Sequence, residues 1–351
     1  MDGPRFVISA SEAESMARNA NLSLLQLLPT LVKSAQTLAL PPISNYRVAA
    51  VGLSSDGRIF AGVNLEFAGA PLHHSVHAEQ FLVTNLAVHG APRLLAVAVS
   101  DAPCGHCRQF FQELRNAADL QILITSGHDQ GKDQKPTECF EDDEKPTEDF
   151  KPSDPQILIE KDEKPINYEP LISFLKYPFG PFDLLNKQTP LLLEPHNNGL
   201  QLQIQTLPTS ENPSLCNGYS KSHDKDGLLE IAALEAANAS HAPYSGCPSG
   251  VALMDCEGEI YKGFYIESAA YNPSLGPVQA ALVAYMAAGG GGYERIVAGV
   301  LVEREGAAVT VRQEDTARMF LKLISPKCKV RVLHCVLGSN GCERPCVLVS
   351  E

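Results

Sequence analysis

The sequence predicts an α/β fold that occurs twice in the chain. A length of 351 residues exceeds what one hydrophobic core usually organises, so two domains are expected. Apolar strand-like runs alternate with helical patterns, which is typical of layered α/β domains. The segment DGRIFAGVNLEFAGAPL at 56–72 also has a counterpart in EGEIYKGFYIESAAYNPSL at 257–275. Two long copies indicate a duplicated domain and not a solenoid of short repeats.

Residues 1–40 are predicted to form a short N-terminal helical segment. The stretch 8–40 contains LSLLQLLPTLVKSAQTLAL, whose apolar residues recur along one face of a helix. Pro29 lies within this stretch, and a proline removes one backbone donor from the helical hydrogen bonds. We therefore expect a kink or a break at Pro29.

The first domain is predicted to span 41–190. Two apolar runs flank the pair Asp56-Gly57, which favours a tight hairpin turn between two strands. HAEQFLVTNLAV then predicts a helix that ends before Gly90, and LLAVAVS predicts a strand covered on both faces. CRQFFQELRNA and LQILIT predict a second helix and another buried strand. This order of elements is the basis for the α/β prediction.

Composition separates two further segments from the folded domains. Residues 126–168 consist mainly of Lys, Asp, Glu and Pro, so they cannot bury enough apolar surface to fold alone. They are predicted to be a flexible acidic insertion in the first domain. Residues 191–227 are predicted to be a linker, because the polar stretch 206–227 carries Pro and Gly. The second domain then covers 228–351.

Charge and hydropathy exclude several classes of partner. The net charge of −13 argues against binding to nucleic acid. The chain has no run of about 18 apolar residues, so we expect no membrane partner. Its first residues lack the basic start and apolar core of a signal peptide, and early acidic residues argue against a transit peptide. A cytosolic protein is therefore expected.

The ten cysteines favour metal or catalytic use over a disulfide framework, given that no export signal is expected. Cys104 and Cys107 form a C-x-x-C pair that can bind a metal or act in redox chemistry. Cys335, Cys342 and Cys346 near the C-terminus are loosely spaced and have no convincing fourth ligand. We interpret these three as incidental and not as a second metal site.

A zinc site is predicted from His77, Cys104 and Cys107. Two thiolates and one imidazole supply three ligands and leave the fourth tetrahedral position of zinc open for water, as catalytic sites require. Glu79 lies two residues from His77 and can accept and return protons as a general acid–base. The order H-x-E followed by P-C-x-x-C, here with Pro103, is similar to the signature of zinc deaminases.

The cysteine pair has two other interpretations. A closed structural zinc site needs a fourth protein ligand. His73 and His74 are better candidates for that position than His106, which lies inside the C-x-x-C turn. A redox pair like that of thioredoxin would leave the H-x-E segment unexplained.

Four motifs resemble the cytidine deaminase family, and specifically its two-domain homodimeric form from bacteria and plants. They are NLEF at 64–67, HAEQ at 77–80, PCGHCRQF at 103–110 and PFGPFDL at 178–184. The similarity extends over roughly 15–125 and 170–335. It implies a three-layer α/β/α fold in duplicate, one zinc ion per chain, a homodimer, and hydrolytic deamination of cytidine and 2′-deoxycytidine in pyrimidine salvage.

The resemblance also implies roles for five residues outside the zinc motif. Asn64 and Glu66 match the pair that binds the ribose hydroxyls, and strand alternation places both on the face opposite Val63, Leu65 and Phe67. Without the resemblance, the same pattern would describe a polar solvent-facing side. Tyr46 occupies the place of a family Phe that packs on the nucleoside. Phe179 and Tyr271 match residues that reach into the active site of the partner subunit.

The second copy is predicted to lack the chemistry. Neither a ligand nor an acid occurs around Pro277-Val278-Gln279, where H-x-E should fall, and no P-C-x-x-C follows. Its expected role is dimerisation or completion of a neighbouring pocket. Two other functions compete with nucleoside deamination. One is a weak or inactive zinc-binding paralog that acts as an interaction protein, and the other is a deaminase of another nucleoside or nucleotide.

Overall fold

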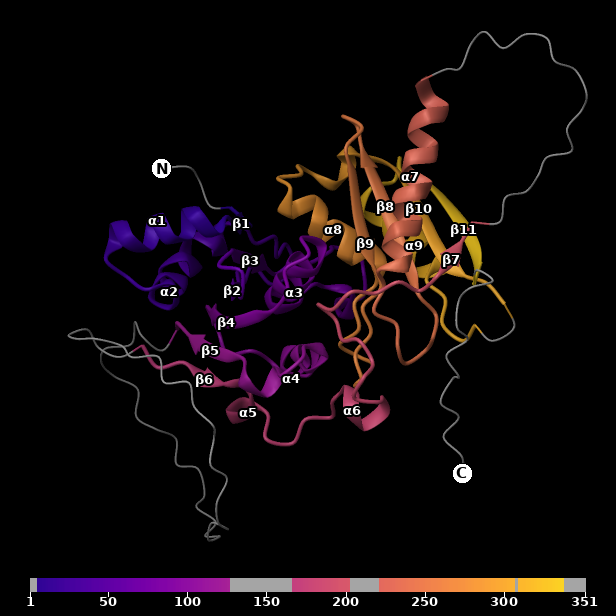
Figure 1. Cartoon of the computed structure of the whole chain (residues 1–351). Helices are drawn as coiled ribbons and strands as arrows, with labels where there is room; N and C mark the ends of the chain where they lie inside the picture. Colours follow the sequence, from indigo (N-terminus) through magenta and orange to yellow (C-terminus); the bar gives the residue numbers. More distant parts are fainter. Residues whose placement is uncertain (1–4, 127–165, 203–220, 307–308, 338–351) are drawn as a thin grey trace, which may run out of the picture.

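The computed structural model describes residues 5–126, 166–202, 221–306 and 309–337 of the chain, with side chains from 226 onward in the third of these ranges. It contains a six-stranded sheet in the order β1-β3-β2-β4-β5-β6 and a five-stranded sheet in the order β7-β11-β10-β8-β9. Figure 1 shows the two halves side by side, each with helices packed on its sheet. The duplicated α/β fold is therefore confirmed.

The N-terminal segment forms two helices, and the chain breaks between them and not at Pro29. Helix α1 (Ala10–Ala20) ends at Asn21, which adopts the left-handed conformation with φ 56°. Helix α2 (Leu24–Ala35) then begins with a capping box between Ser23 and Gln26. Pro29 lies inside α2, so the expected break at this proline is wrong.

The structure shows how α2 accommodates the proline. Pro29 has no N–H, so the carbonyl of Leu25 loses its usual helical donor. The hydroxyl of Tyr168 donates a hydrogen bond to this carbonyl at 2.9 Å. A side chain distant in sequence thus replaces the missing backbone bond.

The first sheet follows the predicted order. β2 (Ala49–Ser54) and β3 (Ile59–Val63) form the expected antiparallel hairpin, and β4 (Leu94–Val99) pairs with β2 and runs parallel to β5 (Gln121–Ile124). Every residue of β2 and β3 is buried, so both faces of these strands are covered. β1 (Val7–Ile8) and β6 (Glu169–Pro170) complete the edges.

Helices α3 (Ala78–Val88) and α4 (Gly105–Phe110) begin at the predicted places. The second of them is shorter than expected, because the chain tightens into a 3-10 turn at Phe111–Glu113 and extends at Leu114. Two short helices, α5 (Leu171–Phe174) and α6 (Pro181–Leu184), follow the insertion. Further 3-10 turns lie at Gln36–Leu38, Leu72–His74, Ala117–Asp119 and Tyr293–Arg295.

The second half repeats this order of elements. Its helices are α7 (Lys221–Asn238), α8 (Pro277–Ala287) and α9 (Glu314–Ile324). Its strands are β7 (Leu200–Gln201), β8 (Ser249–Asp255), β9 (Ile260–Phe264), β10 (Ile296–Arg304) and β11 (Lys329–Leu337). β7 and the start of α7 fall within the range 191–227 that was predicted as a linker.

The two halves meet through a shared apolar core and a symmetric pair of glutamines. Buried side chains of both halves form one continuous cluster, and Phe67 packs edge-on against Phe320. Gln80 of α3 donates to the carbonyl of Pro273 at 2.9 Å, and Gln279 of α8 contacts Nδ1 of His74 at 3.2 Å. His74 is therefore packed at the contact between the halves.

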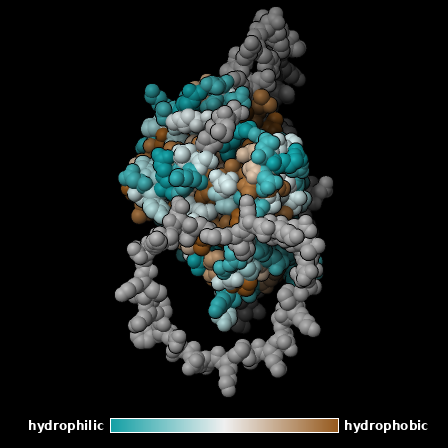
Figure 2. Space-filling model, turned by 90° about the vertical axis from the view of Figure 1, so that its left-hand side faces the viewer, coloured by the Kyte–Doolittle hydropathy of each residue, from teal (hydrophilic) through white to brown (hydrophobic). Residues whose placement is uncertain are grey.

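Some sequence predictions concern residues outside those that the structure describes. They include positions 127–165 of the acidic insertion and the cysteines at 342 and 346. Within the described ranges, no helix is long and apolar enough to cross a membrane. Seen from the side of α1, the surface carries hydrophilic and intermediate residues with hydrophobic ones in small scattered groups (Figure 2).

Candidate active site

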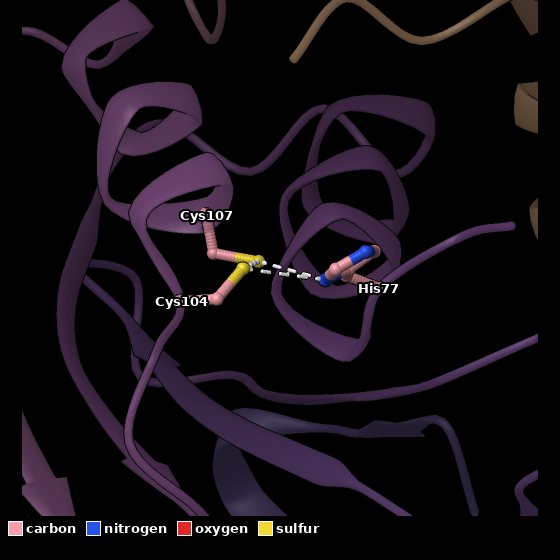
Figure 3. Close-up of side chains that lie close together, drawn as sticks. All are labelled: His77, Cys104 and Cys107. Atoms are coloured by element: carbon pink, nitrogen blue, oxygen red, sulfur yellow. Dashed lines mark hydrogen bonds between the residues drawn. The ribbon is translucent and has the colours of Figure 1, made fainter. Parts of the chain in front are cut away.

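Three side chains converge between the starts of two helices. His77 is the N-cap of α3, Cys104 is the N-cap of α4, and Cys107 lies in the first turn of α4. Nδ1 of His77 lies 3.6 Å from Sγ of Cys104 and 3.4 Å from Sγ of Cys107, and the two Sγ atoms are 3.7 Å apart. Figure 3 shows the three side chains pointing toward one another.

These distances fit a tetrahedral zinc ion. Zn–S bonds of about 2.3 Å and Zn–N bonds of about 2.0–2.1 Å at tetrahedral angles place sulfur atoms about 3.8 Å apart and sulfur about 3.6 Å from nitrogen. Among the described residues, the group of mutually close ligand atoms here contains only His77, Cys104 and Cys107. Three ligands leave one position of zinc open, which is the arrangement of a catalytic site.

The neighbouring histidines do not supply a fourth ligand in this arrangement. The rings of His73 and His74 lie against each other, and His74 also packs on Phe320. His106 stacks on the ring of His77 with 4.9 Å between centroids. The structure therefore gives no support to the closed structural site.

Local contacts fix the two helices that carry the ligands. The side chain of Gln80 accepts a hydrogen bond from the backbone N–H of His77 at 3.1 Å. Gly62 of β3 lets α3 approach closely, because a Cβ at this position would lie 2.2 Å from the carbonyl oxygen of Ala78. Arg108 donates to the carbonyls of Pro103 at 2.6 Å and Phe174 at 2.9 Å.

The surroundings of the cysteine pair favour a thiolate at Cys104. A hydrogen bond from Cys107, followed by the effect of His77, lowers the pKa of Cys104 to about 3 against the opposing effect of burial. The same hydrogen bond raises the pKa of Cys107, and the Cys104 thiolate raises the pKa of His77. Glu79 is only 4% exposed, and burial raises the pKa of its carboxyl group. A carboxyl whose pKa is raised holds a proton more readily, which suits a group that both accepts and donates protons.

Asn64 and Glu66 lie where strand alternation predicts. Both are half-buried, while Val63, Leu65 and Phe67 on the opposite face are buried. The side chain of Asn64 accepts from the N–H of Val48 and donates to the carbonyl of Tyr46, both at 2.9 Å.

Glu66 binds the loop at 43–44. Its carboxylate accepts hydrogen bonds from the N–H groups of Ile43 and Ser44 at 2.9 and 2.8 Å, and from Oγ of Ser44 at 2.5 Å. Burial acts to raise the pKa of Glu66, but these hydrogen bonds outweigh it and lower the pKa. Glu66 is therefore a carboxylate at neutral pH.

The three remaining predicted residues are exposed. Tyr46 is 57% exposed and donates from its hydroxyl to Asp101, just before the cysteine turn, at 2.6 Å. Phe179 is 47% exposed, and its carbonyl accepts from the side chain of Gln109 of α4 at 2.7 Å. Tyr271 is 68% exposed, in a loop where its φ is 60°. None of the three belongs to the cluster of ligand atoms.

The second half carries no zinc ligands at the equivalent described positions. Gly276 is the N-cap of α8 as His77 is of α3, and Val278 takes the place of Glu79. Tyr265 pairs with Ser249 as Asn64 pairs with Val48. Neither glycine nor valine has a side chain that can bind zinc or transfer a proton.

One other group of side chains has suitable ligand atoms, Glu303, Glu314 and His334. Both carboxylates already have cationic partners, since Arg312 lies 3.5 Å from Glu303 and Arg318 lies 2.8 Å from Glu314. Adding a divalent ion would leave excess positive charge, so we assign this group as an ion-pair cluster.

The sequence predictions did not include Glu113, which the structure places in a fully buried position. It follows α4 directly, and its carboxylate binds three groups of the second half. An acid between the pair Phe110-Phe111 and Leu114 was the available signal, but the partners lie more than a hundred residues away.

The chain is similar to several known proteins. Two family models, both described as "Cytidine and deoxycytidylate deaminase zinc-binding region", match residues 23–123 and 171–318. "Cytidine deaminase 1" of Arabidopsis thaliana is 53% identical over 95% of this chain and 99% of its own length. "Cytidine deaminase 6" of the same plant is 45% identical over 88% of this chain and 91% of its own length. Among solved structures, cytidine deaminase from Mycobacterium leprae is 30% identical over 29% of this chain and 88% of that chain, with a TM-score of 0.27.

Proposed function

The chain belongs to the zinc-dependent cytidine deaminase family, and we propose that it hydrolyses cytidine and 2′-deoxycytidine to the corresponding uridines and ammonia. The matches to the two family models and to Cytidine deaminase 1 confirm the predicted family, enzyme class and zinc cofactor. The observation that carries the substrate-level proposal is the three-ligand group of His77, Cys104 and Cys107 with a buried Glu79 two residues from His77. Pyrimidine salvage is the role that this reaction would serve.

Glu79 performs the proton transfers in this proposal. Zinc, when bound, acts as a Lewis acid and lowers the pKa of a water ligand toward about 7. Glu79 takes a proton from the attacking water and delivers it to the ring nitrogen of the pyrimidine. It then takes the remaining proton from the hydroxyl group added to the ring carbon and passes it to the amino group, so that the C–N bond breaks and ammonia leaves. Burial supports this role, because a raised pKa lets the carboxyl hold the proton between the two transfers.

Asn64, Glu66 and Tyr46 are proposed to bind the nucleoside. Asn64 and Glu66 lie just after β3, and their side chains face the same way. Both contact the loop that contains Tyr46. Carboxylate and amide groups are suitable partners for ribose hydroxyls. A carboxylate such as Glu66 also disfavours a phosphate at the sugar, which supports a free nucleoside over a nucleotide or nucleic acid.

Assembly and location complete the proposal. Phe179 and Tyr271 are exposed apolar side chains, which supports their insertion into the active site of a partner subunit in a homodimer. The absence of ligands at Gly276 and Val278 supports one zinc ion per chain. A cytosolic location remains part of the proposal.

The test measures the loss of cytidine absorbance with purified protein, together with zinc content of the same sample. Wild type should deaminate cytidine and 2′-deoxycytidine but not adenosine, with about one zinc ion per chain. Glu79→Gln should retain zinc and lose about 10²–10⁴-fold in kcat. Glu303→Gln, at a buried glutamate of the second half, is the matched control and should keep the wild-type kcat.

Three outcomes would contradict the proposal or its assignment of Glu79. Zinc-loaded wild type without turnover would favour the interaction protein, and turnover of adenosine or a nucleotide in place of cytidine would favour the other deaminase. Equal turnover in wild type and Glu79→Gln would remove Glu79 from the mechanism.

A further inference from the structure

We propose that Glu113 is a positioning residue through which the catalytically silent second half holds the zinc-binding helix α4 in place. The inference rests on the proposed zinc site and concerns how that site is kept in shape. It gives the second half a role within its own chain, in addition to any role in dimerisation.

The carboxylate of Glu113 collects three hydrogen bonds, all from the second half. Oε2 lies 2.9 Å from Nε2 of His241 and accepts from the hydroxyl of Tyr244 at 2.7 Å. Oε1 accepts from the backbone N–H of Ala269 at 2.7 Å. The side chains of Glu113 and His241 are both fully buried. We call these four residues the Glu113 cluster.

Burial makes these contacts mutually dependent. A carboxylate without water is stable only if donors occupy its oxygens, and a buried donor without an acceptor is equally unfavourable. If α4 and the second half moved apart, both sides of the Glu113 cluster would lose their partners at once. The cluster therefore favours a single arrangement of the zinc helix relative to the second half.

A chain of contacts links the cluster back to the first half. Nδ1 of His241 lies 3.2 Å from Nε2 of His196, and Nδ1 of His196 lies 2.5 Å from the carbonyl oxygen of Glu194. Glu194 in turn pairs with Arg115, two residues after Glu113, at 2.6 Å. The ring of contacts thus begins and ends on the segment that follows α4.

Proton counting shows why this group tolerates burial. The carbonyl of Glu194 can only accept, so the three contacts from Glu194 through the two imidazoles to Glu113 need three protons. Two neutral imidazoles supply two of these protons. The third proton lies either on one of the imidazoles, which is then an imidazolium beside the Glu113 carboxylate, or on Glu113, which is then a carboxylic acid beside two neutral imidazoles. In both cases the group is neutral overall, which removes the main cost of burying an acid.

The position of Glu113 connects the cluster to the metal ligands. It lies six residues after Cys107, at the end of the 3-10 turn that continues α4. Helix α4 has only six residues, and a helix this short depends on tertiary contacts to stay formed. The backbone carbonyl of Glu113 also accepts from Leu192 at 3.1 Å. Fixing Glu113 therefore fixes the helix turn that carries Cys107.

The test uses the zinc-loaded full-length chain and the variants Glu113→Gln and Tyr244→Phe. Amide hydrogen exchange at 107–114 and the rate of zinc release to a chelator are measured. We expect both rates to rise at least tenfold in Glu113→Gln, and in the same direction in Tyr244→Phe, although Tyr244 belongs to the other half. The effect of the double variant should be smaller than the product of the two single effects, because both changes disrupt one cluster.

The control is Asp255→Asn, at a buried acid whose side chain binds the β8–β9 turn and the hydroxyl of Tyr261 in β9, both within the second half. It should destabilise that half without changing zinc release. Exchange and zinc release within twofold of wild type in both Glu113→Gln and Tyr244→Phe would overturn the proposal. Tyr244→Phe alone decides the matter if Glu113→Gln does not fold. Lack of cytidine turnover in wild type would contradict only the proposed function, since neither readout depends on turnover.

Discussion

Glu66 and Glu267 occupy equivalent positions in the two halves and make the same three hydrogen bonds. Glu66 accepts from the N–H groups of Ile43 and Ser44 and from Oγ of Ser44. Glu267 accepts from the N–H groups of Tyr244 and Ser245 and from Oγ of Ser245. The second half has no zinc ligand at the position of His77 and no acid at the position of Glu79. This contact therefore belongs to the fold and does not by itself indicate substrate binding.

The first prediction separates the two roles of Glu66. Glu66→Ala and Glu267→Ala each leave two backbone N–H groups without their acceptor, so each should lower the free energy of unfolding by about 1.5–3 kcal/mol. Glu66→Ala should also raise KM for cytidine by about 10- to 100-fold, because a charged hydrogen-bond partner of the sugar is lost. Urea unfolding and steady-state kinetics measure the two effects.

Glu267→Ala is the matched control, with KM expected within twofold of wild type. If both variants change KM equally, Glu66 acts only by holding its loop, and the proposal that it binds the ribose is wrong.

The second prediction concerns the close approach of β3 and α3 at Gly62. A Cβ there would lie 2.3 Å from the backbone nitrogen of Leu82, so Gly62→Ala must displace α3. We expect a loss of about 1–3 kcal/mol in stability. We also expect at least a tenfold fall in kcat, since His77 and Glu79 move with the helix.

The equivalent change in the second half tests whether the fall in kcat comes from displacing α3 or from a general loss of stability. Gly263→Ala places a Cβ 1.9 Å from the nitrogen of Ala281 in α8 and should destabilise the chain to a similar degree. Its kcat per folded molecule should remain closer to wild type than that of Gly62→Ala. Equal losses of kcat would show that stability and not the place of α3 limits activity.

The third prediction tests the bond between Tyr168 and the carbonyl of Leu25. Tyr168→Phe removes the donor and leaves this carbonyl unpaired, so it should cost about 1–3 kcal/mol. In a Pro29→Ala background the cost should be smaller, because position 29 then supplies the helical N–H. A double-mutant cycle from urea unfolding measures the coupling. Additive effects would mean that Tyr168 does not substitute for the missing N–H.

The fourth prediction concerns acid stability. Hydrogen bonds from Arg115 lower the pKa of Glu194 below its ordinary value of 4.5, against the opposing effect of burial. A carboxyl with a lowered folded-state pKa stabilises the fold above its unfolded-state pKa, and this contribution disappears as the pH falls through the folded-state pKa. Wild type should therefore lose stability as the pH falls below about 4.5.

Glu194→Gln should be less stable than wild type at pH 7 and show a flatter dependence between pH 5 and pH 3. Glu14→Gln is the control, because Glu14 pairs with Arg18 only on the exposed surface at 3.6 Å. Its pH dependence should run parallel to that of wild type. Urea unfolding across this range measures both, and parallel curves for all three proteins would contradict the prediction.

Local patterns in the sequence were sufficient for much of the fold and for the predicted site. The alternation around Asn64 and Glu66 correctly assigned the buried face, because strand geometry sends neighbouring side chains to opposite sides. The duplication could be recognised from Gly62 and Gly263. Glycine recurs at these positions because each strand packs so closely against a helix that a Cβ would overlap the helix backbone. His77, Cys104 and Cys107 could be recognised as candidate zinc ligands, because zinc binds imidazole and thiolate groups and the two cysteines form a C-x-x-C pair.

The sequence by itself thus determined most of the elements, their buried faces and the identity of the candidate ligand residues. Only the tertiary structure decided which distant groups meet. The donors to Glu113 lie 128 or more residues away, and the donor that makes Pro29 acceptable in α2 is Tyr168, at a separation of 143 residues from Leu25. Periodicity reports whether a side chain is buried, but the partner of a buried polar group depends on how whole elements pack.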